Sequence, residues 1–156
     1  MRRRTGWPRL CLAFCGATVV STQVVTGENW PNWRGPTRNG VASEVVPVEW
    51  DTERNVAWRL EMPEWTGSTP VVWNEKIFLN VANGDNLELW CLDRNNGQPL
   101  WKRFLSSGNH RERKQNMSSP SPVTDGRHVW VMTGTGFLRA FDFDGTEVWM
   151  RDIQAD

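Results

Sequence analysis

Two stretches decide the fold: Leu89-Trp90-Cys91-Leu92-Asp93-Arg94-Asn95-Asn96-Gly97-Gln98-Pro99-Leu100-Trp101 and Leu138-Arg139-Ala140-Phe141-Asp142-Phe143-Asp144-Gly145-Thr146-Glu147-Val148-Trp149. In each, an apolar segment ends at an Asp, a turn containing a Gly follows, and a Trp lies four residues after that Gly. Upstream, Thr69-Pro70-Val71 is repeated as Ser121-Pro122-Val123, and the next apolar segment begins seven residues after the Pro in both copies. The repeat period is 48 to 52 residues. We therefore predict one structural unit that occurs twice.

Each copy predicts four short strands separated by turns. Ile77, Leu79 and Val81 alternate with Phe78 and Asn80, the period of two expected of a sheet. The expected strands are 70–73, 77–82, 87–93 and 100–104 in the first copy, and 121–124, 128–133, 137–143 and 147–153 in the second. A repeat of this length with four strands is typical of a β-propeller blade. We predict an all-β propeller segment with blades at 69–104 and 121–153, and a partial blade at 55–60 whose Trp58 matches Trp101 and Trp149.

The N-terminal residues predict export. Arg2, Arg3 and Arg4 precede an apolar stretch from Leu10 to Val20, which is too short to span a bilayer. This order predicts a secretory signal peptide over residues 1–27, and therefore a periplasmic or extracellular protein. Membrane contact is expected only if this segment is retained as an anchor or lipidated at Cys15. It holds four of the 18 basic residues and no acid, which leaves 14 basic and 18 acidic residues in a chain that we expect not to bind nucleic acid.

Two irregular segments complete the chain. Residues 28–54 contain Trp30-Pro31-Asn32-Trp33-Arg34-Gly35-Pro36 and predict a strap laid over the fold. Residues 106–120 predict an exposed loop between the blades that contains Arg111-Glu112-Arg113-Lys114. That mixed-charge run is either a solvated loop or a docking surface for an acidic partner.

Candidate catalytic and metal-binding residues are few, and a structural role explains each of them. Ser118, His110 and Asp125 contain the groups of a hydrolase triad, but no nucleophile elbow surrounds Ser118. His110 with Met117 or Glu112 lacks the spacing of a metal site. Asp93 and Asp142, like Asp85 and Asp144, belong to turns, where a carboxylate accepts backbone N–H groups. His128 lies at a strand start, and Cys91 aligns with Ala140, which predicts a packed small residue. We predict no catalytic, cofactor-binding or metal residue.

The 11 Trp residues divide by position. Trp58, Trp101 and Trp149 occupy matching places and are expected to pack between blades, whereas Trp30, Trp33 and Trp65 have no counterpart. Among these, Trp65-Thr66-Gly67-Ser68 is the best candidate for a ring that stacks on a sugar or a quinone.

The apolar segment ending in Asp, the turn Gly and the closing Trp resemble the PQQ-like β-propeller repeat, named after the pyrroloquinoline-quinone dehydrogenases. Trp30-Pro31-Asn32-Trp33-Arg34-Gly35-Pro36 also resembles the start of secreted bacterial members. The resemblance implies either a quinoprotein alcohol or sugar dehydrogenase with PQQ and calcium, or a scaffold without a cofactor. It also implies a ring of seven or eight blades, so we expect this chain to be a fragment.

We therefore predict an exported PQQ-like propeller fragment that acts as a binding or assembly scaffold without catalysis or cofactor of its own. Its partner is expected to be a protein, or the missing blades of the same protein. The alternatives are the N-terminal part of a PQQ-dependent dehydrogenase and a Trp-lined carbohydrate-binding module.

Overall fold

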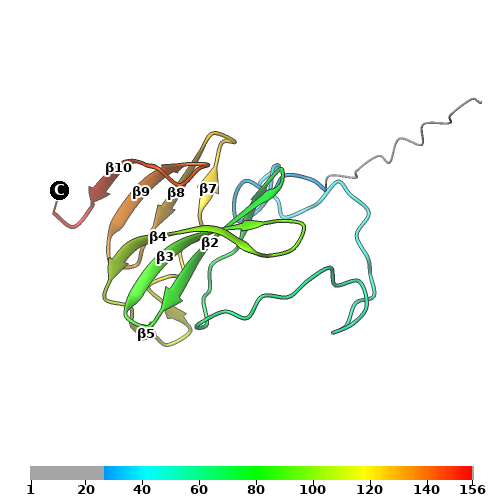
Figure 1. Ribbon diagram of the computed structural model, residues 1–156, viewed down its shortest axis with the longest axis horizontal. Coiled ribbons are helices and arrows are strands. Elements are labelled where there is room, and N and C mark those ends of the chain that lie inside the picture. Colours follow the sequence, from blue (N-terminus) through cyan, green and yellow to red (C-terminus); the bar gives the residue numbers. More distant parts are fainter. Residues whose placement is uncertain (1–26, 156) are drawn as a thin grey trace, which may run out of the picture.

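The structure, a computed structural model, describes residues 27–155 and is built from strands and irregular segments (Figure 1). Apart from Gly27, the predicted signal peptide lies outside these residues, as do Cys11 and Cys15. Between residues 27 and 155, no helix is found that is long and apolar enough to cross a membrane.

Two antiparallel four-stranded sheets form the body of the molecule, and in both the strands are adjacent in chain order. Blade 1 consists of β1 (Val71–Trp73), β2 (Lys76–Asn83), β3 (Asn86–Asp93) and β4 (Pro99–Ser107). Blade 2 consists of β7 (Val123–Thr124), β8 (His128–Met132), β9 (Phe137–Asp142) and β10 (Glu147–Asp152). A small hairpin of β5 (Arg111–Glu112) and β6 (Gln115–Asn116) interrupts the connection between them. The prediction of an all-β propeller segment with two four-stranded blades is confirmed.

The main core lies between the two blades. Phe78 and Cys91 of blade 1 are fully buried in one cluster with Val129, Val131 and Phe141 of blade 2. Alternation along β2 and β3 points these blade 1 side chains toward blade 2 and points their neighbours to the opposite face. That opposite face is covered by chain that precedes blade 1, so both faces of blade 1 are packed.

A Trp that lies on a turn glycine connects successive units. The Trp101 indole lies against Gly145 in the last turn of blade 2, where an added Cβ would be 2.9 Å from the ring, and its Nε1 donates to the Phe143 carbonyl at 3.1 Å. Trp58 lies against Gly97 of blade 1 in the same way, with Nε1 donating to the Arg94 carbonyl at 2.7 Å. Both carbonyls belong to the residue directly after the turn Asp. The two Trp residues therefore make equivalent contacts one unit apart.

The segment before blade 1 contacts both sheets. Trp30 pairs with Val72 of β1 through two backbone hydrogen bonds, and the Pro31 carbonyl accepts the Thr124 N–H of β7 at 2.9 Å. Residues 55–60, the predicted partial blade, form no strand, because no described strand pairs with them. Their place in the fold is given by the side chain of Trp58.

Candidate functional site

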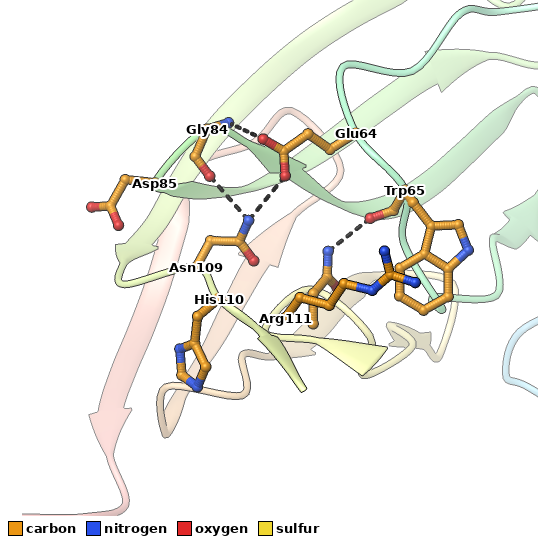
Figure 2. A pocket seen from close by; sticks show the side chains of 8 residues that line it. Glu64, Trp65, Gly84, Asp85, Asn109, His110 and Arg111 are labelled. Atoms are coloured by element: carbon orange, nitrogen blue, oxygen red, sulfur yellow. Dashed lines mark hydrogen bonds between the residues drawn. The ribbon is translucent and has the colours of Figure 1, made fainter. Parts of the chain in front are cut away.

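An open pocket of about 490 Å³ lies where the chain before blade 1, the β2–β3 turn and the β5–β6 hairpin meet (Figure 2). Its lining residues are Glu64, Trp65, Gly84, Asp85, Asn109, His110, Arg111 and Asn116. The pocket therefore combines Trp65, the predicted stacking residue, with the charged run that begins at Arg111. These two segments were predicted as separate candidates, and the fold brings them together.

Glu64 and Asn109 form the polar wall of the pocket (Figure 2). The Glu64 carboxylate accepts the Gly84 N–H at 3.1 Å with one oxygen and the Asn109 side-chain amide at 3.1 Å with the other. The same Asn109 amide donates to the Gly84 carbonyl at 3.0 Å. Asp85 accepts the Gly108 N–H at 3.2 Å, and in the figure its side chain points away from Glu64. Both carboxylates therefore already accept hydrogen bonds from other segments of the chain.

The β5–β6 hairpin is fixed at its base and exposed at its tip. Asn116 is buried and donates its side-chain amide to the Trp65 carbonyl at 2.7 Å, which ties the hairpin to the segment before blade 1. The Arg111 guanidinium lies 5.7 Å from the centre of the Trp65 ring, a cation–π distance. Trp65 nevertheless remains 52% exposed. Arg113 and Lys114, at the tip, are also exposed, as is Glu112, so the hairpin presents three cationic side chains and one carboxylate from a base that Asn116 anchors.

The residues of the hypothetical triad each make contacts of their own. Ser118 is fully buried, and its hydroxyl contacts Thr66 Oγ1 and Asn116 Oδ1, each at 2.8 Å. His110 Nδ1 lies 3.2 Å from the Gly108 carbonyl, within its own loop. Asp125 accepts the N–H groups of Arg127 and His128, both at 2.8 Å, in the β7–β8 turn. Hydrogen bonds from those two N–H groups hold the pKa of Asp125 below its usual value.

The remaining candidates have structural contacts. Asp142 accepts the Thr146 N–H at 2.8 Å and the Asp144 N–H at 3.0 Å, and the first of these bonds is the main cause of its lowered pKa. Asp93 likewise accepts the Asn95 N–H at 2.7 Å. Met117, proposed as a partner of His110, packs on the core between the blades instead. Burial raises the pKa of the Cys91 thiol to about 12, which keeps it protonated at neutral pH.

A calcium-dependent quinone site requires a convergent set of ligands. Across residues 27–155, no three His, Cys, Asp or Glu side chains come close enough together to hold a metal ion.

Glu64, Asn109 and Asn116 are the pocket residues that the sequence did not reveal. Each lies outside the repeat, and each acts through a partner at least 20 positions away in the chain. No local pattern predicts such pairings. Lys76 is a similar case, because its Nζ donates across the blade interface to the Phe143 carbonyl at 2.7 Å.

Comparison with known proteins identifies the family. The model of the family described as outer membrane protein assembly factor BamB matches residues 41–156, and the chain therefore belongs to this family of PQQ-like propeller repeats. None of the curated proteins compared with the chain matches it.

Two similar solved structures differ in what their names describe. BamB from Moraxella catarrhalis is 23% identical with a TM-score of 0.49, and the match covers 61% of this chain and 27% of that one. A quinohemoprotein alcohol dehydrogenase from Pseudomonas putida HK5 is 21% identical with a TM-score of 0.46, covering 64% of this chain and 15% of that one. The matched part is thus about a quarter or less of the length of these proteins.

Proposed function

We propose that this chain is part of an exported scaffold that binds an acidic segment of a partner protein at the β5–β6 hairpin and catalyses no reaction itself. The observation that carries the proposal is the hairpin: Arg111, Arg113 and Lys114 are exposed on a base that Asn116 holds to the Trp65 carbonyl. Membership of a family described as an assembly factor supports a scaffold role.

The geometry of the hairpin suits a charged partner. A fixed base lowers the ordering cost of binding, because fewer backbone torsions are immobilised when the partner arrives. The hairpin carries three basic side chains, Arg111, Arg113 and Lys114, and one acid, Glu112, so its own net charge is positive. Exposed charge pairs are screened by salt, so binding here is expected to weaken as ionic strength rises.

Charge reversal of the hairpin tests the proposal. The probe is a fluorescein-labelled oligoglutamate peptide, whose binding is followed by fluorescence anisotropy at low and high salt. The triple variant Arg111→Glu/Arg113→Glu/Lys114→Glu should bind at least about tenfold more weakly. Arg127→Glu, at an exposed position in the β7–β8 turn, is the matched control and should bind as the unchanged chain does. Equal binding by the triple variant, or dye reduction with alcohols after addition of PQQ and calcium, would refute the proposal.

Carbohydrate binding is a second candidate, favoured by the exposure of Trp65 beside polar groups. An exposed indole can stack on the apolar face of a sugar while amide and carboxylate side chains bind its hydroxyls. Trp65→Ala should then abolish oligosaccharide binding measured by calorimetry. Trp33→Ala is the control, because Trp33 is 68% exposed and also has an Arg guanidinium near its ring, that of Arg34.

A further inference from the structure

Arg111 differs from the other basic residues of the β5–β6 hairpin because two contacts orient its side chain. Its Nε donates to the Arg113 carbonyl at 3.3 Å, and its guanidinium lies 5.7 Å from the centre of the Trp65 ring. Figure 2 shows this side chain reaching from the hairpin to the indole. Between residues 27 and 155, no hydrogen bond or ion pair engages its two terminal nitrogens, Nη1 and Nη2. The guanidinium is therefore held by one edge and one face, and its outer edge is free.

The carbonyl that holds Arg111 belongs to a residue with a left-handed backbone. Arg113 has φ +51°, a region that a residue with a side chain enters at a cost in free energy. It lies in the two-residue turn between β5 and β6. Strained backbone positions persist where the surrounding structure requires them, and they cluster at binding sites. Here the strained residue supplies the acceptor that orients the Arg111 guanidinium.

The free edge of this guanidinium matches a carboxylate. Nη1 and Nη2 present two parallel N–H groups in one plane, spaced for the two oxygens of a carboxylate. Paired charge-assisted hydrogen bonds of this kind add geometric specificity to the attraction between the charges. A guanidinium that is already oriented also loses less conformational freedom when a ligand binds.

The side chains of Arg113 and Lys114 are not oriented in this way. Both are exposed, and within the described part of the chain no hydrogen bond, ion pair or ring contact holds either of them. They add positive charge, which attracts an anion without selecting its shape. The inference that follows rests on the proposed function of the hairpin.

We propose that Arg111 is the residue that recognises the acidic partner, because its Nη1 and Nη2 bind both oxygens of one Asp or Glu carboxylate. Trp65 and the Arg113 carbonyl hold the guanidinium in place for this contact. The side chains of Arg113 and Lys114 contribute only their charge. The hairpin therefore selects for a planar carboxylate and not for negative charge alone.

Replacing each arginine by lysine tests the proposal, because lysine keeps the charge and removes the paired N–H groups. The probe is the fluorescein-labelled oligoglutamate peptide, followed by fluorescence anisotropy over a range of salt concentrations. Arg111→Lys should bind it at least about fivefold more weakly than the unchanged chain does. Its dependence on salt should stay the same, because the net charge is the same. Arg113→Lys is the matched control, since it makes the same exchange two residues away, and it should bind as the unchanged chain does.

Trp65 is expected to act through Arg111, as a positioning residue, and a double-mutant cycle tests this coupling. Trp65→Leu removes the attraction between the ring and the guanidinium and should weaken binding severalfold, whereas Trp65→Phe should keep most of the affinity. In the Arg111→Lys background, Trp65→Leu should cause less than about twofold further loss, because the oriented guanidinium is already gone.

Two results would overturn the proposal and leave the function of the hairpin intact. If the triple charge reversal weakens binding but Arg111→Lys binds within about twofold of Arg113→Lys, charge alone attracts the peptide. If Trp65→Leu causes the same loss in both backgrounds, the indole does not act through Arg111.

Other outcomes separate the proposal from its premise. Peptide binding that survives the triple charge reversal would refute the function of the hairpin, and the role of Arg111 with it. An oligogalacturonate of matched length that binds more tightly than the peptide, and loses affinity in Arg111→Lys, would make a uronic acid the ligand. That result would overturn the assignment of a protein carboxylate.

Discussion

The contact between Trp58 and Gly97 can be tested by adding a single methyl group. Gly97 has φ +72°, and a Cβ at this position would lie 2.4 Å from Cε3 of the Trp58 indole. Gly97→Ala therefore incurs two costs, a left-handed backbone conformation for a residue with a side chain and a clash with a packed ring. Gly84→Ala provides the control for the first cost alone, because Gly84 has φ +59° and no atom lies within 4 Å of its added Cβ.

The two costs can be given magnitudes. The left-handed conformation costs an L-residue about 1–2 kcal/mol, which is the full effect expected for Gly84→Ala. Overpacking costs a further 1–3 kcal/mol or so, so Gly97→Ala should lower the free energy of unfolding by about 2–5 kcal/mol. Urea denaturation followed by far-UV circular dichroism measures both, because this signal arises mainly from the backbone of the strands.

A double-mutant cycle isolates the clash. In a Trp58→Ala background the ring is gone, and Gly97→Ala should then cost no more than Gly84→Ala does. The expected interaction energy between the two sites is about 1–3 kcal/mol. A Gly97→Ala cost equal to that of Gly84→Ala in the unchanged chain would refute the reasoning, and so would a cost that persists in full without Trp58. Either result would mean that the indole does not lie on the turn.

Three further predictions concern buried or turn-forming groups. Cys91, in a Cys11→Ser/Cys15→Ser background, should not react with a chromogenic disulfide reagent at pH 8 until urea unfolds the protein, because burial raises the pKa of its thiol to about 12. Rapid reaction of the folded protein would contradict the burial of this thiol. Asn80 is fully buried, and its amide donates to the Pro120 carbonyl at 3.2 Å and the Met132 carbonyl at 3.0 Å. Asn80→Ala should therefore lower the free energy of unfolding by about 1–3 kcal/mol, and Asn80→Asp by more, because a carboxylate cannot donate to those carbonyls. Urea titration of the two variants measures both losses, and equal losses would contradict these hydrogen bonds. Asp142 has a lowered pKa because the Thr146 N–H donates to it, so the stability it adds is present above about pH 4 and is lost as the pH falls through its folded-state pKa. In thermal melts, Asp142→Asn should therefore lose less stability between pH 5 and pH 2 than the unchanged chain does. An unchanged acid profile would argue against this hydrogen bond.

The sequence predicted the elements that repeat. The eight strands of the two blades begin and end within a few residues of the predicted bounds, because alternation and turn residues are local signals that occur twice. Asp93 and Asp142 were predicted as turn residues from their matching places, and both accept backbone N–H groups. The buried place of Cys91 followed from its alignment with Ala140.

The sequence predicted single residues of the pocket but not that they lie together, and the reason is physical. Trp65 and Arg111 were each singled out, but their separation of 46 positions gave no sign that the guanidinium would lie over the ring. That placement depends on Asn116, whose amide binds the Trp65 carbonyl across 51 positions. A hydrogen bond between two unrepeated segments has no periodic pattern, so one sequence does not predict it.

The repeated contacts and the unrepeated ones contribute differently to the interface between blades. The Trp–Gly contact occurs at Trp58 and again at Trp101, so it can hold any blade to any other and carries no information about their order. Order requires positions that differ between copies. Asn80 is one of these, because it donates to the Met132 carbonyl of blade 2 and to the Pro120 carbonyl just before that blade, whereas its counterpart in the second copy is Met132, whose side chain has no donor. The face that blade 1 presents to blade 2 and the corresponding face of blade 2 therefore differ in hydrogen-bonding capacity at this position.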